Sequence, residues 1–301
     1  MTPRLRSLMP FAVVVIGIAA FTAMDVAMKD ASIRAGVFTA FVSRNLIGSA
    51  LMLPVWLAGR RQWPSGPVLW LHALRAAIVA AMAPLYFYGL VLLPMAEAIA
   101  LSFIAPLIAL YLAALFLGER VRPGALAASL LGLAGVAVIA VAGLGGTSGG
   151  PPQSPVGIAA ILAGAVLYAA NLVVQRRQAQ AAGSVEVALF QNVMVTLLLI
   201  PFIPWLWHTP ERHALGAIAI GAMLASVALV LLSWGYARAE TQHLLPIEYT
   251  AFFWSALLGW LWFGEAVAPA TVLGAVLIVA GCLVAARGAA RDQHMPATPT
   301  P

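Results

Sequence analysis

The chain has 301 residues, of which 63% are hydrophobic and only 9% are charged. Soluble globular domains carry about 25% charged residues, so this composition indicates an integral membrane protein and excludes a soluble enzyme, a secreted disulfide scaffold and a disordered chain. The net charge of +6 comes from arginines at the ends of apolar runs, which is a topology signal rather than a sign of nucleic-acid binding.

Apolar runs of helical length follow one another along the chain. A helix needs about 20 apolar residues to cross the hydrocarbon core, and no run shows the alternating polarity of barrel strands. The sequence therefore predicts an all-α integral membrane protein with ten transmembrane helices. In chain order these are Leu8–Met28, Phe38–Ala58, Val68–Leu93, Met95–Leu117, Gly124–Leu144, Val156–Gln175, Val185–Trp207, Ala214–Ala237, Leu244–Phe263 and Ala270–Ala286.

The connections between these runs are short. Gly143 to Pro155 is an uncharged linker of Gly, Pro and Ser. The first run follows Arg4 and Arg6 as a signal peptide would, but it lacks a small-residue cleavage signature and is kept as a helix. Residues 289–301 are polar, and we expect a disordered cytoplasmic tail there.

The basic residues predict an orientation. With a cytoplasmic N-terminus, the outer helix ends carry only Lys29, Arg34 and Arg212, so both termini are predicted to face the cytoplasm of a bacterial-type inner membrane. The inner ends carry Arg4, Arg6, Arg60, Arg61, Arg120, Arg122, Arg176, Arg177, Arg238, Arg287 and Arg291.

The sequence also repeats itself. A shift of 146 residues aligns Gly118–Pro123 with Gly264–Pro269 and pairs Asp25 with Asn171 inside predicted helices. Residues 1–146 and 147–288 are therefore predicted to be two five-helix repeats. Because five is odd, the second repeat is inverted relative to the first. Inverted repeats suit alternating access around a midplane site, which favours a carrier over a duplication kept only because it folds well.

Each half contains short motifs: Leu93–Ala98, Phe103–Leu107 and Leu117–Val121 in the first, and Pro246–Tyr249, Gly264–Glu265, Leu273–Ala275 and Ile278–Gly281 in the second. They resemble the EamA-type drug/metabolite transporter superfamily. The resemblance implies a ten-helix fold, a central cavity lined mainly by helices 1, 3, 4, 6, 8 and 9, and movement of small organic metabolites. The first motif is similar to the branch that contains S-adenosylmethionine carriers.

Ionisable side chains within membrane helices cost at least about 2.5 kcal/mol each, so each is a candidate for the transport path. Asp25 and Lys29 share one face of the first helix with Thr22 and are spaced for an i,i+4 pair. They could form a charged rim that binds zwitterions or ions, or a structural pair near the outer surface.

Two arginines fall inside predicted helices. Snorkelling towards lipid phosphate accounts for Arg75, and a structural tie to a neighbouring helix accounts for Arg44. Tyr86 lies on the same helical face as Arg75 but deeper, where its hydroxyl could contact a solute. Tyr88 and Trp234 are repeat mates that could stack on a planar solute, although aromatic residues are common at membrane interfaces.

Two carboxylates are candidates for handling substrate or protons. Glu97 begins the fourth helix, where the helix dipole alone accounts for a negative charge. Glu248 lies about a turn inside the ninth helix, with His243 and Tyr249 nearby, and has no such explanation. Coupling to protons through either residue is a hypothesis that rests on their expected burial.

Motifs for other functions are absent or out of context. The only lysine follows no Gly-rich loop, and a G-x-S-x-G match lies in the linker rather than in a strand–turn–helix. No cofactor or metal site is predicted. We therefore expect a non-enzymatic secondary transporter or facilitator of an amino-acid-like or nucleoside/S-adenosylmethionine-like metabolite, its oligomeric state undetermined. The rival classes are a membrane enzyme acting on lipid and a non-transporting scaffold. The candidate substrate-binding residues are Asp25, Lys29, Tyr86, Tyr88, Glu97, Asn171, Trp234, His243, Glu248 and Tyr249.

Overall fold

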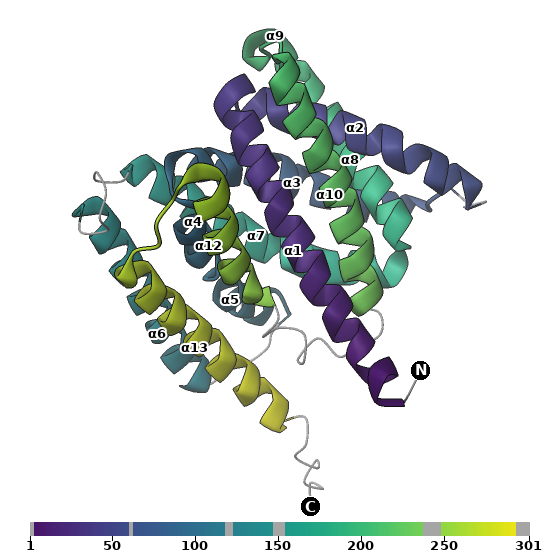
Figure 1. Cartoon of the computed structure of the whole chain (residues 1–301). Helices are drawn as coiled ribbons and strands as arrows, with labels where there is room; N and C mark the ends of the chain where they lie inside the picture. The colour runs from purple at the N-terminus through teal and green to yellow at the C-terminus, as the bar shows by residue number, and fades with distance from the viewer. Residues whose placement is uncertain (1–2, 60–62, 118–122, 147–153, 237–247, 293–301) are drawn as a thin grey trace, which may run out of the picture.

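A computed structural model describes residues 3–59, 63–117, 123–146, 154–236 and 248–292. All regular structure in these residues is helical, as the sequence predicts (Figure 1). The elements are α1 (Pro3–Ala35), α2 (Val37–Ala58), α3 (Gly66–Leu92), α4 (Met95–Ser102), α5 (Ala105–Leu117), α6 (Pro123–Leu144), α7 (Pro155–Ala181), α8 (Ser184–Leu199), the 3-10 helix η1 (Ile200–Phe202), α9 (Ile203–Leu206), α10 (Arg212–Tyr236), α12 (Thr250–Phe263) and α13 (Pro269–Asp292).

Many of these helices suit a membrane by length and composition. Within the described residues, six stretches are long and apolar enough to cross one, and four apolar helices are shorter. Exposed tryptophans lie near helix ends, where their amphipathic rings favour the interface between lipid and water. These are Trp63, Trp70, Trp205, Trp260 and Trp262. The protein is therefore a multi-pass membrane protein.

The fourth predicted helix is interrupted. The turn at Phe103 and Ile104 separates α4 from α5, and Pro106 explains it because proline has no backbone N–H and clashes with the preceding turn. The N–H of Leu107 bonds to the carbonyl oxygen of Ile104 rather than continuing the ladder from Phe103. The carbonyl oxygen of Phe103 instead lies 3.5 Å from Sγ of Cys282.

Other boundaries also differ from the prediction. α1 continues to Ala35, beyond the charged residues that marked its predicted end. The seventh predicted helix divides into α8, η1 and α9, where Pro201 and Pro204 interrupt the regular hydrogen bonding. α13 continues to Asp292, so residues 289–292 are helical rather than disordered, in a stretch rich in the strong helix former alanine. The rest of that predicted tail lies outside the described residues.

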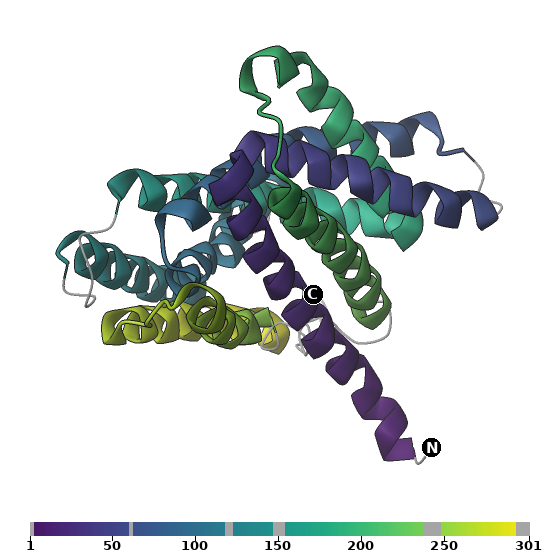
Figure 2. The same ribbon diagram turned by 45° about the horizontal axis from the view of Figure 1, so that its top comes forward.

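The helices pack in pairs of segments that are distant in sequence. α1 packs along α10, α3 along α7, α6 along α13, and α2 against α8. The pairs α1–α10 and α6–α13 lie on different sides of the molecule in both views (Figures 1 and 2). The largest cluster of buried apolar side chains includes Met28, Phe41, Leu90 and Ile161, so one core joins both halves of the chain.

Glycine allows the closest of these contacts. A Cβ atom built on Gly135 of α6 would lie 2.5 Å from the carbonyl oxygen of Gly274 in α13. A Cβ on Gly274 would lie 2.7 Å from the carbonyl oxygen of Gly135. The two backbones therefore touch at these positions, as small residues at a helix interface allow.

Candidate functional site

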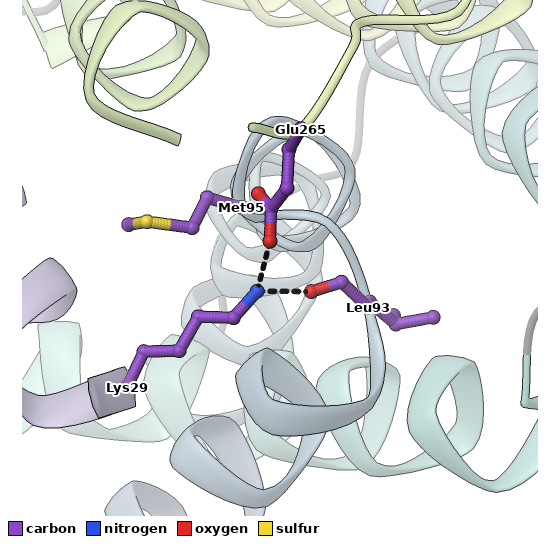
Figure 3. A network of polar contacts seen from close by, with 4 residues as sticks. All are labelled: Lys29, Leu93, Met95 and Glu265. Carbon is purple, nitrogen blue, oxygen red and sulfur yellow. Dashed lines mark hydrogen bonds and ion pairs between the residues drawn. The ribbon is translucent and has the colours of Figure 1, made fainter. Parts of the chain in front are cut away.

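Lys29 of α1 connects the junction between α3 and α4 to the segment that follows α12 (Figure 3). Its Nζ donates hydrogen bonds to the carbonyl oxygen of Leu93 at 2.8 Å and to Oε1 of Glu265 at 2.5 Å. The backbone N–H of Met95 donates to Oε2 of Glu265 at 2.7 Å. The lysine side chain is only 5% exposed. We call this network of Lys29, Leu93, Met95 and Glu265 the Lys29 lock.

Local sequence places each partner in the Lys29 lock. Leu93 is extended, as expected for a residue before proline, so α3 ends there with its carbonyl turned away from the helix. Gly264 ends α12 in the left-handed conformation, and its N–H bonds to the carbonyl oxygen of Trp260, which is the αL capping motif. The N–H of Glu265 bonds to the carbonyl oxygen of Gly259. Glu265 is thereby directed at the first turn of α4, where unsatisfied N–H groups favour an anion.

The i,i+4 pair that the spacing of Asp25 and Lys29 permits does not form. Lys29 is paired with Glu265 instead, and Asp25 accepts a hydrogen bond from the hydroxyl of Tyr86 at 3.0 Å. Spacing along one helix identified which residues share a face. It could not identify partners that lie on other helices.

Glu97 is buried in the first turn of α4, beside the Lys29 lock. The hydroxyl of Thr271 in α13 donates to Oε1 of Glu97 at 3.0 Å. The carboxylate therefore links α4 to α13 in addition to lying at a helix N-terminus.

Replacing Thr271 with valine is expected to lower the free energy of unfolding by about 1–3 kcal/mol, because a buried carboxylate oxygen loses a donor. Thermal unfolding of the purified variant measures the change. Thr22→Val is the matched control: Thr22 donates only to the carbonyl of Ile18 in its own helix, so little should change. Equal losses in the two variants would contradict a stabilising role for the Thr271–Glu97 bond.

A second polar group lies between α1, α3 and α7. Asp25 is 3% exposed and Tyr86 reaches it from α3. Tyr168 of α7 is within electrostatic range of Asp25, Arg75 and Glu248, although 36% of its surface is exposed. Polar side chains of α1, α3 and α7 therefore lie close to one another here.

Arg75 does not snorkel as predicted. Its side chain is buried and donates to three amides of α7, at 3.0 Å to Asn171, 2.7 Å to Gln178 and 3.3 Å to Gln175. The polar partners along α7 remove the need to reach lipid phosphate. The predicted site residue Asn171 is therefore brought to α3, next to Tyr168 on its own helix.

The remaining candidates are placed separately. The ring of Tyr249 packs edge-on against Phe103, with centroids 5.1 Å apart, and Glu248 precedes it at the start of the described segment. Trp234 is half-buried on α10. Tyr88 is 45% exposed and lies two residues from Tyr86, on the opposite face of α3. His243 lies outside the described residues.

Sequence reasoning missed Tyr168 and gave Arg44 only a structural role. A signal for Tyr168 was available: the 146-residue shift maps Thr22 to Tyr168 and Asp25 to Asn171, so the polar face of the first helix has a counterpart on α7.

Comparison with known proteins identifies the family. The sequence matches the EamA-like transporter family twice, over residues 8–141 and 155–287. The fold is similar to a solved crystal structure with a TM-score of 0.62 and 25% identity, covering 95% of this chain and 99% of the other.

Named relatives are transporters. A "Riboflavin transporter" of Rhizobium johnstonii is 29% identical over 76% of this chain and 74% of its own length. The "Aromatic amino acid exporter YddG" of Ancylobacter novellus is 30% identical over 75% and 77%. An "S-adenosylmethionine uptake transporter" of Rickettsia bellii is 23% identical over 87% and 88%. The chain belongs to the EamA-like transporter family and is a multi-pass membrane transporter of small metabolites.

Proposed function

We propose that this protein is a secondary transporter that carries a small organic metabolite across a bacterial inner membrane by alternating access. Two inverted five-helix repeats, residues 1–146 and 147–288, would rock around a site between them. The observation that carries the proposal is the double family match, at 8–141 and again at 155–287, with its two starts separated by nearly the 146-residue shift of the internal repeat.

The helix pairing supports the repeat. Exchanging the two halves replaces α1, the first span, with α7, the sixth, and replaces α10, the eighth span, with α3, the third. The packed pair α1–α10 is thereby replaced by the packed pair α7–α3. In the pairs α2–α8 and α6–α13, the exchange replaces each helix with its own partner, so both pairs are unchanged. Two repeats related by a two-fold axis predict this pattern. The six longer and four shorter apolar helices also support ten spans.

The orientation predicted from the arginines, with both termini in the cytoplasm, places the Lys29 lock at the outer surface. In that orientation the lock ties the first, fourth and ninth helices together and closes the outer side of the path. The polar group around Asp25, Tyr86 and Tyr168 lies further along the helices and is the proposed substrate site. The named relatives support amino-acid-like or nucleoside/S-adenosylmethionine-like solutes.

Reconstitution of the purified full-length protein into phospholipid vesicles tests this function. The vesicles are loaded with unlabelled L-phenylalanine, S-adenosylmethionine or riboflavin, and uptake of the same labelled compound is followed. We expect saturable counterflow of at least one compound, recovered chemically unchanged, and none in protein-free vesicles. A chemically altered compound would indicate an enzyme. The absence of any saturable counterflow would contradict the proposal and favour a scaffold.

The same vesicles test proton coupling through Glu97 or Glu248. If either carboxylate carries the proton, an imposed pH gradient drives accumulation, and replacement of that residue with glutamine abolishes this drive while counterflow continues. If accumulation of the labelled compound is the same with and without the pH gradient, in the native protein and in both variants, proton coupling is overturned but transport is not.

A further inference from the structure

The carboxylate of Asp25 has one oxygen occupied and one available. The hydroxyl of Tyr86 donates to Oδ2 at 3.0 Å and fixes the orientation of the group. Oδ1 is buried and has no hydrogen-bond partner among the described residues. Buried polar atoms are nearly always bonded, so this open carboxylate oxygen can accept a hydrogen bond from a bound ligand.

Arg44 brings an opposite charge to the same place. From α2 its Nη1 reaches to 3.9 Å from Sδ of Met24, the residue before Asp25, and its guanidinium lies 5.6 Å from the ring centroid of Phe41. The guanidinium therefore lies beside α1 at the residue next to Asp25, where the two opposite charges attract each other. Within the part of the chain that the structure describes, they nevertheless form no ion pair, with each other or with any other residue.

Two opposite charges held close without contact in a low-dielectric setting gain most from a ligand that bridges them. The ligand needs a cationic donor for Oδ1 of Asp25 and, one or two bonds away, an anionic acceptor for the planar fork of Arg44. Lys29 is not available for this role, because the Lys29 lock occupies it.

We propose that Asp25 and Arg44 bind the zwitterionic head group of an α-amino acid, with the ammonium on Asp25 and the carboxylate on Arg44. This inference rests on the proposed transport function and narrows its substrate. It selects solutes that carry an α-amino-acid group, which amino acids and S-adenosylmethionine share, over solutes without one, such as riboflavin and adenosine.

The first experiment needs no variant. Thermal stabilisation of the purified full-length protein is measured with the proteinogenic L-amino acids, S-adenosylmethionine, riboflavin and adenosine. For the tightest amino acid, the amine that lacks the carboxylate and the acid that lacks the ammonium are tested next. We expect saturable stabilisation by at least one α-amino acid, and an affinity lower by at least about tenfold for both truncated analogues, because each leaves one protein charge unpaired.

Paired variants assign the two ends of the head group. Arg44→Gln should lower the affinity for the intact amino acid about tenfold but leave the affinity for the amine unchanged. Asp25→Asn should also lower the affinity for the intact amino acid about tenfold, but leave the affinity for the acid that lacks the ammonium unchanged. If Asp25 and Arg44 only stabilise the fold, each variant should lower the affinity for every ligand by the same factor. Arg34→Gln is the control, since Arg34 lies on the same helix as Asp25 but pairs only with Asp30 at an exposed position.

The outcomes separate this inference from the proposed function. Binding and counterflow of riboflavin or adenosine, with no α-amino acid bound, would overturn the head-group assignment and leave transport standing. Truncated analogues that bind as well as the intact amino acid would also overturn the assignment. If no compound in the panel binds and none shows counterflow, both the assignment and the proposed function fail.

Discussion

Methionine in place of Lys29 is expected to lower the free energy of unfolding by about 3–5 kcal/mol, the usual cost of removing one partner from a buried ion pair. The Glu265 carboxylate, only 19% exposed, would keep its charge but lose its cation. The carbonyl of Leu93 would also lose a donor. Chemical or thermal unfolding of the purified protein measures the loss.

Two further variants distinguish a lost pair from a damaged helix. The double variant Lys29→Met with Glu265→Gln should recover most of the stability, because no uncompensated charge remains. Arg34→Gln, which removes an exposed i,i+4 partner of Asp30, should cost no more than about 0.5 kcal/mol. If Lys29→Met is no less stable than Arg34→Gln, the Lys29 lock does not stabilise this conformation.

Leucine in place of Gly135 is expected to cost about 3 kcal/mol of unfolding free energy, at the upper end for an overpacked interface. The obstacle is the backbone oxygen of Gly274, which cannot swing aside as a side chain would, so α6 and α13 must separate. Part of the apolar contact along these two helices is then lost, which unfolding of the purified variant detects.

Gly216 provides the matched control for this substitution. It lies in α10 with nothing within 4 Å of an added Cβ. Gly216→Leu should therefore leave stability unchanged or raise it by up to about 1 kcal/mol, the gain in helix propensity. A Gly135→Leu protein as stable as the wild type would show that α6 and α13 do not meet as the structure has them.

Sequence patterns predicted the local features of the fold and missed the distant ones. Apolar runs located α2, α3 and α6 to within a few residues, because burial in lipid imposes the same demand on every turn of a helix. The turn at Phe103 was missed even though Pro106 was visible, since hydropathy continues unchanged across it. Proline inside α3, at Pro84, does not break that helix, so its presence alone does not locate an interruption.

The candidate site shows the same division. Helical spacing placed Asp25 and Lys29 on one face, but their partners Tyr86 and Glu265 come from α3 and from the segment after α12. No spacing rule links Lys29 to a residue 236 positions away. The prediction for Arg75 was wrong for a related reason. Side-chain amides of α7 accept hydrogen bonds from the buried guanidinium, and these partners become visible only when α3 is seen packed on α7.

The interruption between α4 and α5 places the only sulfhydryl of the protein at a sensitive point. Cys282 is buried, and its thiol donates to the carbonyl oxygen of Phe103, which has no helical hydrogen bond at the interruption. Any rearrangement that straightens this segment withdraws that oxygen and changes how readily an alkylating reagent reaches the thiol. The native chain thus contains a single-site chemical reporter of its own interior, and labelling can follow movement there without a cysteine being added or removed.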